Sequence, residues 1–256
     1  MRSILIPLAC LTAAVLLPIG SASATVAYPV ENATLTDNPL YAAGSLPVTE
    51  CPEKPIKKLN VSSAKNYLNG VLACLNHTWA VQLENTGQSF SKPKVAFATK
   101  APKKFCGEKW LKGWSSHYCI DSRTILIVLE RNLLEEPDDL YLFNLLAMHY
   151  GGHVQNVVGI YRAYEKIPYR NKAELAEQRR RYNLQSNCFS GVFIASVWDS
   201  LDRTQEDWDD LLVYTREWAS TINGTRKTIN YWTSRGFKSA DLSSCNTWSA
   251  ASSKVA

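Results

Sequence analysis

The pattern of hydrophobic and polar residues changes along the first half of this chain from a helical repeat to short apolar runs. Residues 63–83 repeat apolar positions at the three- and four-residue intervals that predict a helix. The segments KVAFAT at 94–99 and TILIVLE at 124–130 are short and apolar, which predicts two strands. A loop bracketed by cysteines separates them. We therefore expect a small sheet packed on helices.

The second half of the chain carries long helical patterns. The residues PDD at 137–139 are a good helix start, because acidic side chains favour the positive N-terminal end of a helix. Helices are predicted over 138–164, 173–199 and 206–222. Apolar residues point in almost every direction around the first of them, as in a helix buried on most sides. We therefore predict an α+β fold, mainly helical, with two central helices packed on a small sheet.

The first 24 residues have the pattern of a secretory signal peptide. Arg2 precedes an apolar stretch, and Ala22, Ser23 and Ala24 form a small-residue cleavage signal. We expect cleavage after Ala24 and a protein that is secreted or held in the cell envelope. An uncleaved leader that anchors the chain in a membrane is the alternative, although its apolar stretch is shorter than the roughly 20 residues of a typical span.

Proline-rich sequence separates the expected leader at 1–24 from the periodic segments. Residues 25–60 contain five prolines and little periodicity, which predicts an extended arm that lies along the domain or leads to it. We expect the domain to occupy residues 61–250, with a short tail at 251–256. No internal repeat is visible.

Six cysteines remain once the leader, with Cys10, is removed. An even number in an exported chain predicts three disulfides, although spacing alone does not determine which cysteines pair. A zinc site built from cysteines is the alternative, but the chain contains no Cys-x-x-Cys pair to support it. The pairs that we favour are Cys51–Cys74, Cys106–Cys119 and Cys188–Cys245.

The charge of the chain does not indicate a nucleic-acid partner. The formal net charge is +5 at pH 7, and Arg2 would leave with the leader. The basic runs KPIKK and QRRRY are short, so we interpret them as solvated surfaces. An exported protein with so weak a basic patch is not expected to bind nucleic acid.

Two histidines stand close together in the sequence LLAMHYGGHVQNVVGI at 145–160. His149 and His153 are four residues apart, a spacing at which one helix face offers two imidazoles to a zinc ion. The residue after His149 is Tyr150, a poor base at neutral pH, where a zinc peptidase needs a glutamate. The pattern therefore leaves two interpretations: histidines hydrogen-bonded within the core, or a metal site that another element completes.

Two segments together resemble a bacterial family, the neutral zinc metallopeptidases. MHYGGHVQNVVGI at 148–160 is similar to the family's HEYGHHVQ helix, and RRRYNLQSNCFSGVF at 179–193 is similar to its ELQADCFAG helix. The likeness covers most of residues 60–250, including CLNHTW and the terminal CNTW. It implies a zincin-like scaffold in which two histidines and a glutamate hold zinc, and a second glutamate acts as the base.

The first helix lacks the residues that this chemistry requires. Alignment on the shared tyrosine, glycine, valine and glutamine places the first ligand histidine on Met148 and the catalytic glutamate on His149. The second ligand histidine falls on Gly152. His153 matches an extra histidine of the family that is not a ligand. The resemblance therefore implies that this helix no longer provides zinc ligands.

The second helix lacks the corresponding charged groups. The family's glutamate ligand falls on Asn183, and the aspartate that orients a ligand histidine falls on Asn187. Neither asparagine is charged, so no anion there would offset the charge of a zinc ion. Asn223, in INGTRK, replaces a histidine of related sequences and is a further polar change near the expected cleft.

We therefore predict a catalytically inactive homologue that binds a peptide, a protein or a cell-envelope component without cleaving it. A membrane is expected as a partner only if the leader stays attached. No cofactor is expected, although the resemblance allows zinc. One alternative is an active zinc peptidase that uses His149 and His153 in a shifted register. Another is a purely structural secreted protein in which the former cleft is filled.

Overall fold

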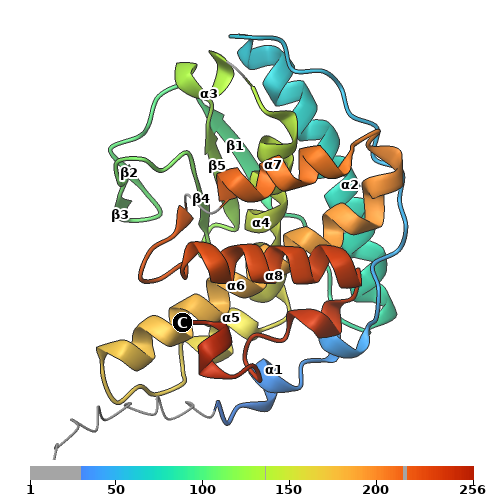
Figure 1. The fold of residues 1–256 in the computed structure, drawn as a ribbon. Helices are drawn as coiled ribbons and strands as arrows, with labels where there is room; N and C mark the ends of the chain where they lie inside the picture. The colour runs from blue at the N-terminus through green and yellow to red at the C-terminus, as the bar shows by residue number, and fades with distance from the viewer. Residues whose placement is uncertain (1–29, 136, 216–217) are drawn as a thin grey trace, which may run out of the picture.

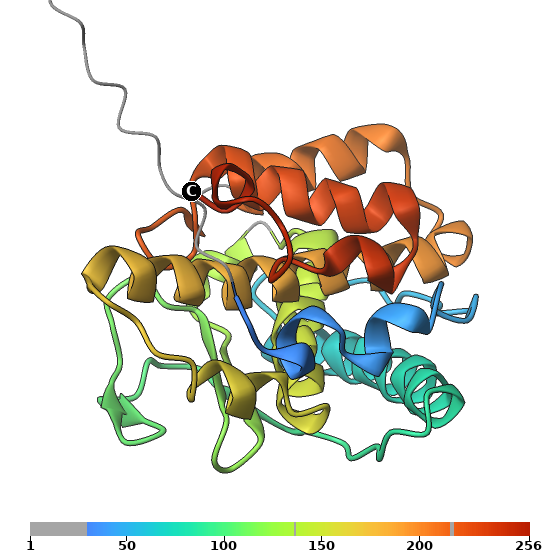
Figure 2. The same cartoon turned by 90° about the horizontal axis from the view of Figure 1, so that it is seen from below.

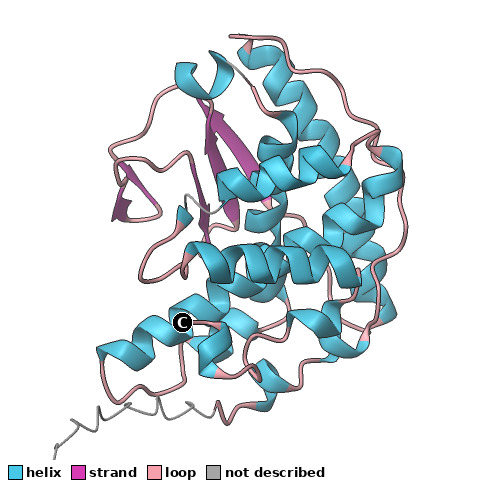
Figure 3. Cartoon of the chain, viewed as in Figure 1, coloured by secondary structure: helices cyan, strands magenta, loops and turns pink. Residues whose placement is uncertain are grey.

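The computed structural model describes residues 30–135, 137–215 and 218–256, so the expected leader lies outside the described residues. Helices make up most of the fold, and a small sheet lies at one side of them (Figures 1 and 3). None of the helices described is long and apolar enough to cross a membrane. The α-helices are α1 (Ala33–Thr36), α2 (Val61–Asn85), α3 (Arg131–Glu135), α4 (Asp139–Val157), α5 (Ile160–Tyr164), α6 (Lys172–Val197), α7 (Gln205–Thr215) and α8 (Arg226–Ser239).

Short 3-10 helices and strands complete the fold. The 3-10 helices are η1 (Pro39–Ala42), η2 (Trp198–Ser200), η4 (Leu242–Cys245) and η5 (Ser252–Lys254). The strands are β1 (Lys94–Ala98), β2 (Lys104–Phe105), β3 (Glu108–Lys109), β4 (Ser116–Cys119) and β5 (Thr124–Val128). The mainly helical fold with a small sheet and the two predicted strands are thus confirmed.

The main sheet has the strand order β1–β5–β4, with β1 parallel and β4 antiparallel to β5. Side chains of a strand alternate between the two faces of its sheet. Ile125 and Ile127 of β5 belong to the large core among the helices, whereas Leu126 and Val128 form a smaller core with Trp110. Burial on both faces explains why this strand is a continuous apolar run in the sequence.

The helix expected over 138–164 is two helices, α4 and α5. Asp138 caps the first by accepting a hydrogen bond from the backbone nitrogen of Tyr141 at 2.9 Å. The second begins after Gly159, whose φ is 82°. A residue in the left-handed region ends an α-helix, so the prediction of one continuous helix was wrong.

The helix expected over 206–222 is also shorter than predicted. α7 ends at Thr215, and a β-bridge joins Ser220 to Gly224 before α8 begins. Gly224 has a φ of 103°, and a β-carbon there would lie 2.6 Å from the hydroxyl of Thr228. The segment 218–224 is therefore a tight turn that only glycine allows.

The described part of the arm, residues 30–60, packs on the domain. It contains α1 and η1, and the side chains of Leu35, Leu40 and Leu46 are buried. A β-bridge between Ser45 and Asp241 joins the arm to the chain that follows α8. Burial of these leucines stabilises the arm against the helices by roughly 1.5–3 kcal/mol per side chain.

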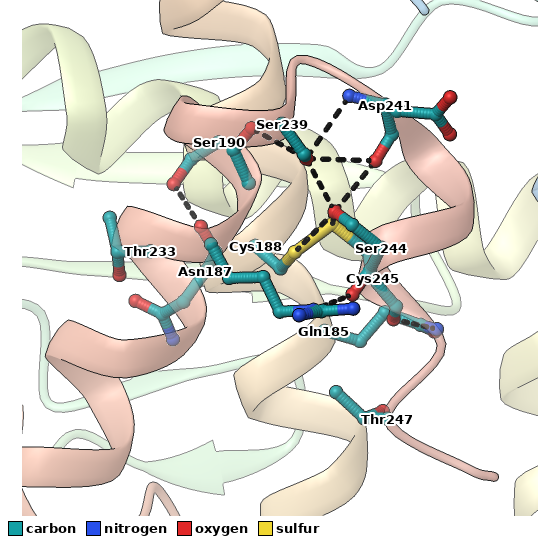
Figure 4. Close-up of a disulfide and its surroundings, with 12 residues drawn as sticks. Gln185, Asn187, Cys188, Ser190, Thr233, Ser239, Asp241, Ser244, Cys245 and Thr247 are labelled. Atoms are coloured by element: carbon teal, nitrogen blue, oxygen red, sulfur yellow. Dashed lines mark hydrogen bonds between the residues drawn. A yellow bond between two sulfur atoms is a disulfide. The ribbon is translucent and has the colours of Figure 1, made fainter. Parts of the chain in front are cut away.

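All three predicted disulfides form. Cys51–Cys74 joins the arm to α2, and Cys106–Cys119 joins the β2–β3 hairpin to β4. Cys188–Cys245 joins α6 to η4. Figure 4 shows this last disulfide beside Ser244, whose hydroxyl donates to the carbonyl oxygen of Asp241 at 2.7 Å.

Helices α6 and α8 pack backbone against backbone. A β-carbon on Gly191 of α6 would lie 2.2 Å from the carbonyl oxygen of Thr233. A β-carbon on Gly236 of α8 would lie 2.1 Å from the carbonyl oxygen of Cys188. Each distance is far below van der Waals contact, so both positions require glycine. Figure 2 shows α8 lying along α6 in this close layer.

The basic run QRRRY holds the C-terminal tail. Arg181 is 1 % exposed and donates to the carbonyl oxygens of Thr247 and Ala250, the latter at 2.8 Å. Its Nη2 also lies 2.7 Å from Oε1 of Glu177. The interpretation of this run as a solvated surface was therefore wrong for Arg181, which a buried charge network satisfies.

Replacing Gly236 by alanine should force α8 away from α6. We expect Gly236→Ala to lower the free energy of unfolding by about 3 kcal/mol, because the new methyl group meets a carbonyl oxygen that cannot move freely. Chemical denaturation with the disulfides intact measures the change. Gly70→Ala in α2 is the matched control, since nothing lies within 4 Å of a β-carbon there. It should raise stability by up to about 1 kcal/mol. Equal effects of the two substitutions would contradict the close helix contact.

Candidate functional site

Strand β4 holds both histidines of helix α4. The Ser116 hydroxyl oxygen lies 2.7 Å from Nε2 of His149, and the Tyr118 hydroxyl oxygen lies 2.9 Å from Nδ1 of His153. Residues two apart on a strand are separated by about 6.7 Å, and residues four apart on a helix by about 6 Å along its axis. The two spacings match, so a pair of hydrogen bonds joins the edge of the sheet to the helix.

His153 is held in a single tautomer. Its Nε2 lies 2.6 Å from the carbonyl oxygen of Ser91, which can only accept, so Nε2 carries the proton. Nδ1 therefore accepts the hydrogen bond from Tyr118, whose oxygen accepts in turn from Asn156 at 3.1 Å. The side chain is 1 % exposed, and burial lowers the pKa of His153. Both ring nitrogens are thus bonded within the protein.

His149 stands in a half-buried position beside β4. Burial lowers the pKa of His149 to about 3, and His117 contributes a further lowering. The ring is therefore neutral at physiological pH. Its distance to Ser116 is that of a nucleophile and its general base. A base with so low a pKa is weak at neutral pH, so the pair is poorly suited to proton abstraction.

Side chains surround Gly152, the position of the family's second ligand histidine. A β-carbon there would lie 3.6 Å from the hydroxyl of Tyr182 and 3.7 Å from both the Ser186 hydroxyl and the Tyr118 ring. These are ordinary van der Waals contacts, so three side chains line the place that an imidazole would need. The neighbouring Gly151 has another role, because a β-carbon there would lie 3.0 Å from a carbonyl oxygen of α6.

Asn183, Asn187 and Asn223 form what we call the asparagine ladder. Nδ2 of Asn183 donates to the carbonyl oxygen of Ile222 at 2.8 Å and to Oδ1 of Asn223 at 3.0 Å. Nδ2 of Asn187 donates to the carbonyl oxygen of Asn183 at 2.9 Å. The structure thus brings together three asparagines that the sequence singled out separately, and it joins α6 to the 218–224 turn.

The residues at the family's five positions do not fit a zinc ion. Zinc in proteins is bound by thiolate, imidazole or carboxylate groups. Met148 and Gly152 offer none of these, and Asn183 directs amide protons at its neighbours. His149 is hydrogen-bonded to Ser116. In the parts of the chain that the structure describes, no three His, Cys, Asp or Glu side chains form a group that could hold a metal.

The sequence did not single out Ser116, Tyr118 or Tyr182, although all three lie at this site. The sequence did contain one indication of two of them. In SHYC, at the end of the segment between Cys106 and Cys119, the polar side chains of Ser116 and Tyr118 are two residues apart, as on one face of a strand. Their contact with the histidines depends on how the sheet packs on α4, and no local pattern shows this.

A comparison with known families identifies the family of this chain. The model of the family described as "Putative neutral zinc metallopeptidase" matches residues 47–212. The chain therefore belongs to this family, and the resemblance seen in its two central helices is confirmed.

Curated relatives are similar to this chain over most of their length. The chain is 26% identical over 211 residues to the uncharacterized protein YpfJ of Escherichia coli K12, covering 74% of this chain and 73% of the relative. YpfJ of the O6:H1 strain of Escherichia coli matches to the same extent. No solved structure matches the chain significantly.

The low pKa of His149 should make the stability of the protein depend on pH. An unfolded histidine binds a proton below about pH 6.5, whereas folded His149 stays neutral down to about pH 3. Stability should therefore fall as the pH is lowered from 6.5 to 5, with His149 contributing roughly 1.5 kcal/mol of the loss. In denaturant titrations at several pH values, His149→Gln should lose less stability over this range than the wild type does. The exposed His77→Gln is the control, and a wild-type slope in His149→Gln would contradict the assignment.

A carboxylate at position 187 should be poorly tolerated. Asn187 is 3 % exposed, and an aspartate would lose the bond to Asn183 and bury a negative charge. We expect Asn187→Asp to lower stability by about 2–4 kcal/mol at pH 7. The pKa of the new carboxyl group would be raised, so the penalty should shrink as the pH falls toward 4. Asn66→Asp, on the exposed face of α2, should have almost no effect. An equal effect of both substitutions would show that site 187 is solvated.

Proposed function

We propose that this protein is an exported member of the family that has lost zinc-dependent peptide hydrolysis and acts by binding a partner. The partner would be a peptide, a protein or a component of the cell envelope. The proposal has three parts, which are the loss of the metal centre, export, and retention of a folded binding scaffold. Each part has separate support.

The amide of Asn183 is the observation that supports loss of the metal centre most directly. It stands where the family has an anionic zinc ligand, yet its nitrogen donates to two oxygen acceptors. A donor group facing two acceptors is satisfied without a cation, and a zinc ion at this place would meet amide protons. The ladder therefore replaces metal coordination by neutral hydrogen bonds.

Three disulfides support export. Disulfides persist in oxidising compartments and are rare in the reducing cytosol. The three pairs in this chain fit a protein outside the cytoplasm. The leader expected at 1–24, with cleavage after Ala24, would direct the chain there.

The alternative of a structural protein with a filled cleft is favoured by one observation. Tyr182, Ser186 and Tyr118 stand at van der Waals distance around Gly152. A hollow of about 570 Å³ on α8, lined in part by Tyr231 and Arg235, offers a partner another surface.

Zinc content tests the loss of the metal centre. We expect the purified protein, after a mild chelator wash, to retain no stoichiometric zinc by atomic emission and to leave peptide and casein substrates uncleaved. One zinc per chain, lost in both His149→Ala and His153→Ala, would overturn the proposal and favour a shifted active site.

A variant that restores the family's residues is the positive control for the same assay. This variant should bind zinc where the wild type does not, and bound zinc should offset the destabilisation expected from Asn187→Asp alone. Its failure to bind, with the fold intact, would show that the surrounding side chains also exclude the metal. The substitutions are Met148→His, His149→Glu, Gly152→His, Asn183→Glu and Asn187→Asp.

A further inference from the structure

Lysines are concentrated on one protruding part of the molecule. Residues 100–112 contain five lysines and a single acidic residue, Glu108, whereas the whole chain has a net charge of only +5. The β2–β3 hairpin that carries them lies at the outer edge of the sheet, away from the helices α2 and α8 (Figures 1 and 2). We call this part the lysine hairpin. All five of its lysines are exposed: Lys100, Lys103, Lys104, Lys109 and Lys112.

The hairpin places two of these charges directly opposite each other. Its turn is formed by Cys106 and Gly107, both with positive φ, as in the two-residue turns of type I′. Lys104 and Lys109 are consequently cross-strand partners. Like charges at such positions destabilise a hairpin, so the pair opposes folding of the segment that carries it.

Within the described chain, no lysine of the hairpin forms an ion pair. The ion pairs in the described residues all use arginine, and none involves a lysine. Surface charges on a protein usually alternate in sign, which limits such repulsion. A one-sided cluster that remains unpaired is instead the electrostatic footprint of an anionic partner.

An exposed leucine accompanies the charge. Leu111 is 49 % exposed between Lys109 and Lys112, just after β3. Its neighbour Trp110 donates from Nε1 to the carbonyl oxygen of Trp114 at 3.2 Å. The two indole rings pack edge to face with centroids 5.6 Å apart. The residues on either side of Leu111 are therefore held together by this indole contact.

A disulfide fixes the hairpin to the sheet. Cys106 lies in its turn and is bonded to Cys119 at the end of β4. A surface that is already ordered loses little conformational entropy when it binds. Binding energy from the lysines and from Leu111 would therefore not be spent on folding the loop.

We propose that the lysine hairpin is a docking surface for an anionic phospholipid bilayer. Its lysines would lie at the level of the lipid phosphates, where each cation contributes to attraction by the surface potential. Leu111 would enter the interface between headgroups and acyl chains. The hairpin would thus hold the protein at a membrane surface.

The exposed leucine favours a bilayer over a soluble polyanion. A polyanion would pair with the lysines alone and gain nothing from an exposed leucine among them. The inference rests on the proposed export and on binding of an envelope component. It is independent of the loss of zinc, because the lysine hairpin contains none of the family's metal positions.

Vesicle co-sedimentation tests this surface with the exported protein, whose N terminus is first checked by mass spectrometry. We expect binding to phosphatidylcholine vesicles that contain phosphatidylglycerol, little binding to phosphatidylcholine alone, and release by salt. Substituting Lys103, Lys104, Lys109 and Lys112 by glutamine should weaken binding about tenfold or more. Leu111→Ser should weaken it roughly fivefold and leave the salt dependence unchanged.

The matched control removes the same charge elsewhere. Lys54, Lys57, Lys58 and Lys227 are exposed outside the hairpin, and their replacement by glutamine should leave vesicle binding nearly unchanged. Thermal melts check folding, and the hairpin variant should be at least as stable as the wild type because the Lys104–Lys109 repulsion is relieved.

Three results would overturn the inference. The first is an equal loss of vesicle binding in the hairpin and control variants. The second is no binding to anionic vesicles. The third is tight binding of soluble polyphosphate, unchanged in Leu111→Ser, by a protein that does not bind vesicles. Zinc measured on the same preparation separates the two proposals. If the protein holds zinc and binds vesicles, only the proposed loss of the metal centre is contradicted. If it is free of zinc and does not bind vesicles, only the proposed membrane docking of the hairpin is contradicted.

Discussion

The backbone contact between α6 and α8 is the constraint on which the rest of the structure depends. Gly191 and Gly236 let each helix place its main chain against a carbonyl oxygen of the other. At this separation Cys188 reaches Cys245, and the buried Arg181 reaches the carbonyl oxygens of the tail. The position of α6 determines in turn which of its side chains face α4 and the 218–224 turn. The asparagine ladder on α6 is thus oriented by the contact that the same helix makes with α8.

Around the asparagine ladder and the two histidines, hydrogen bonds between neutral groups join the elements. In an active zinc enzyme, anionic and imidazole ligands are stabilised by the metal that they bind. Here the asparagine ladder satisfies its own donors, and the two histidines are bonded to β4 and to the backbone of Ser91. These bonds connect α4 to β4 and α6 to the 218–224 turn, and none of them needs a cation.

Positive charge is distributed unevenly along this chain. A net charge of +5 on 256 residues is small, and it conceals a hairpin in which five lysines accompany one acid. The cross-strand pairing of Lys104 with Lys109 is visible only once the register of β2 and β3 is known. The Cys106–Cys119 disulfide and the packing of Trp110 on Trp114 stabilise the hairpin against this repulsion. Its conformation therefore depends on the surrounding structure.

The sequence by itself determined the family, the mainly helical α+β class and the number of disulfides. These features depend on local periodicity, on residue type and on motif spacing, all of which can be read along the chain. Only the tertiary structure decided that Gly159 divides the predicted helix and that Arg181 is buried. It alone also showed that Ser116 and Tyr118 bind the histidines. Such features arise from contacts between segments far apart in the sequence, and a linear pattern carries no record of which side chains meet.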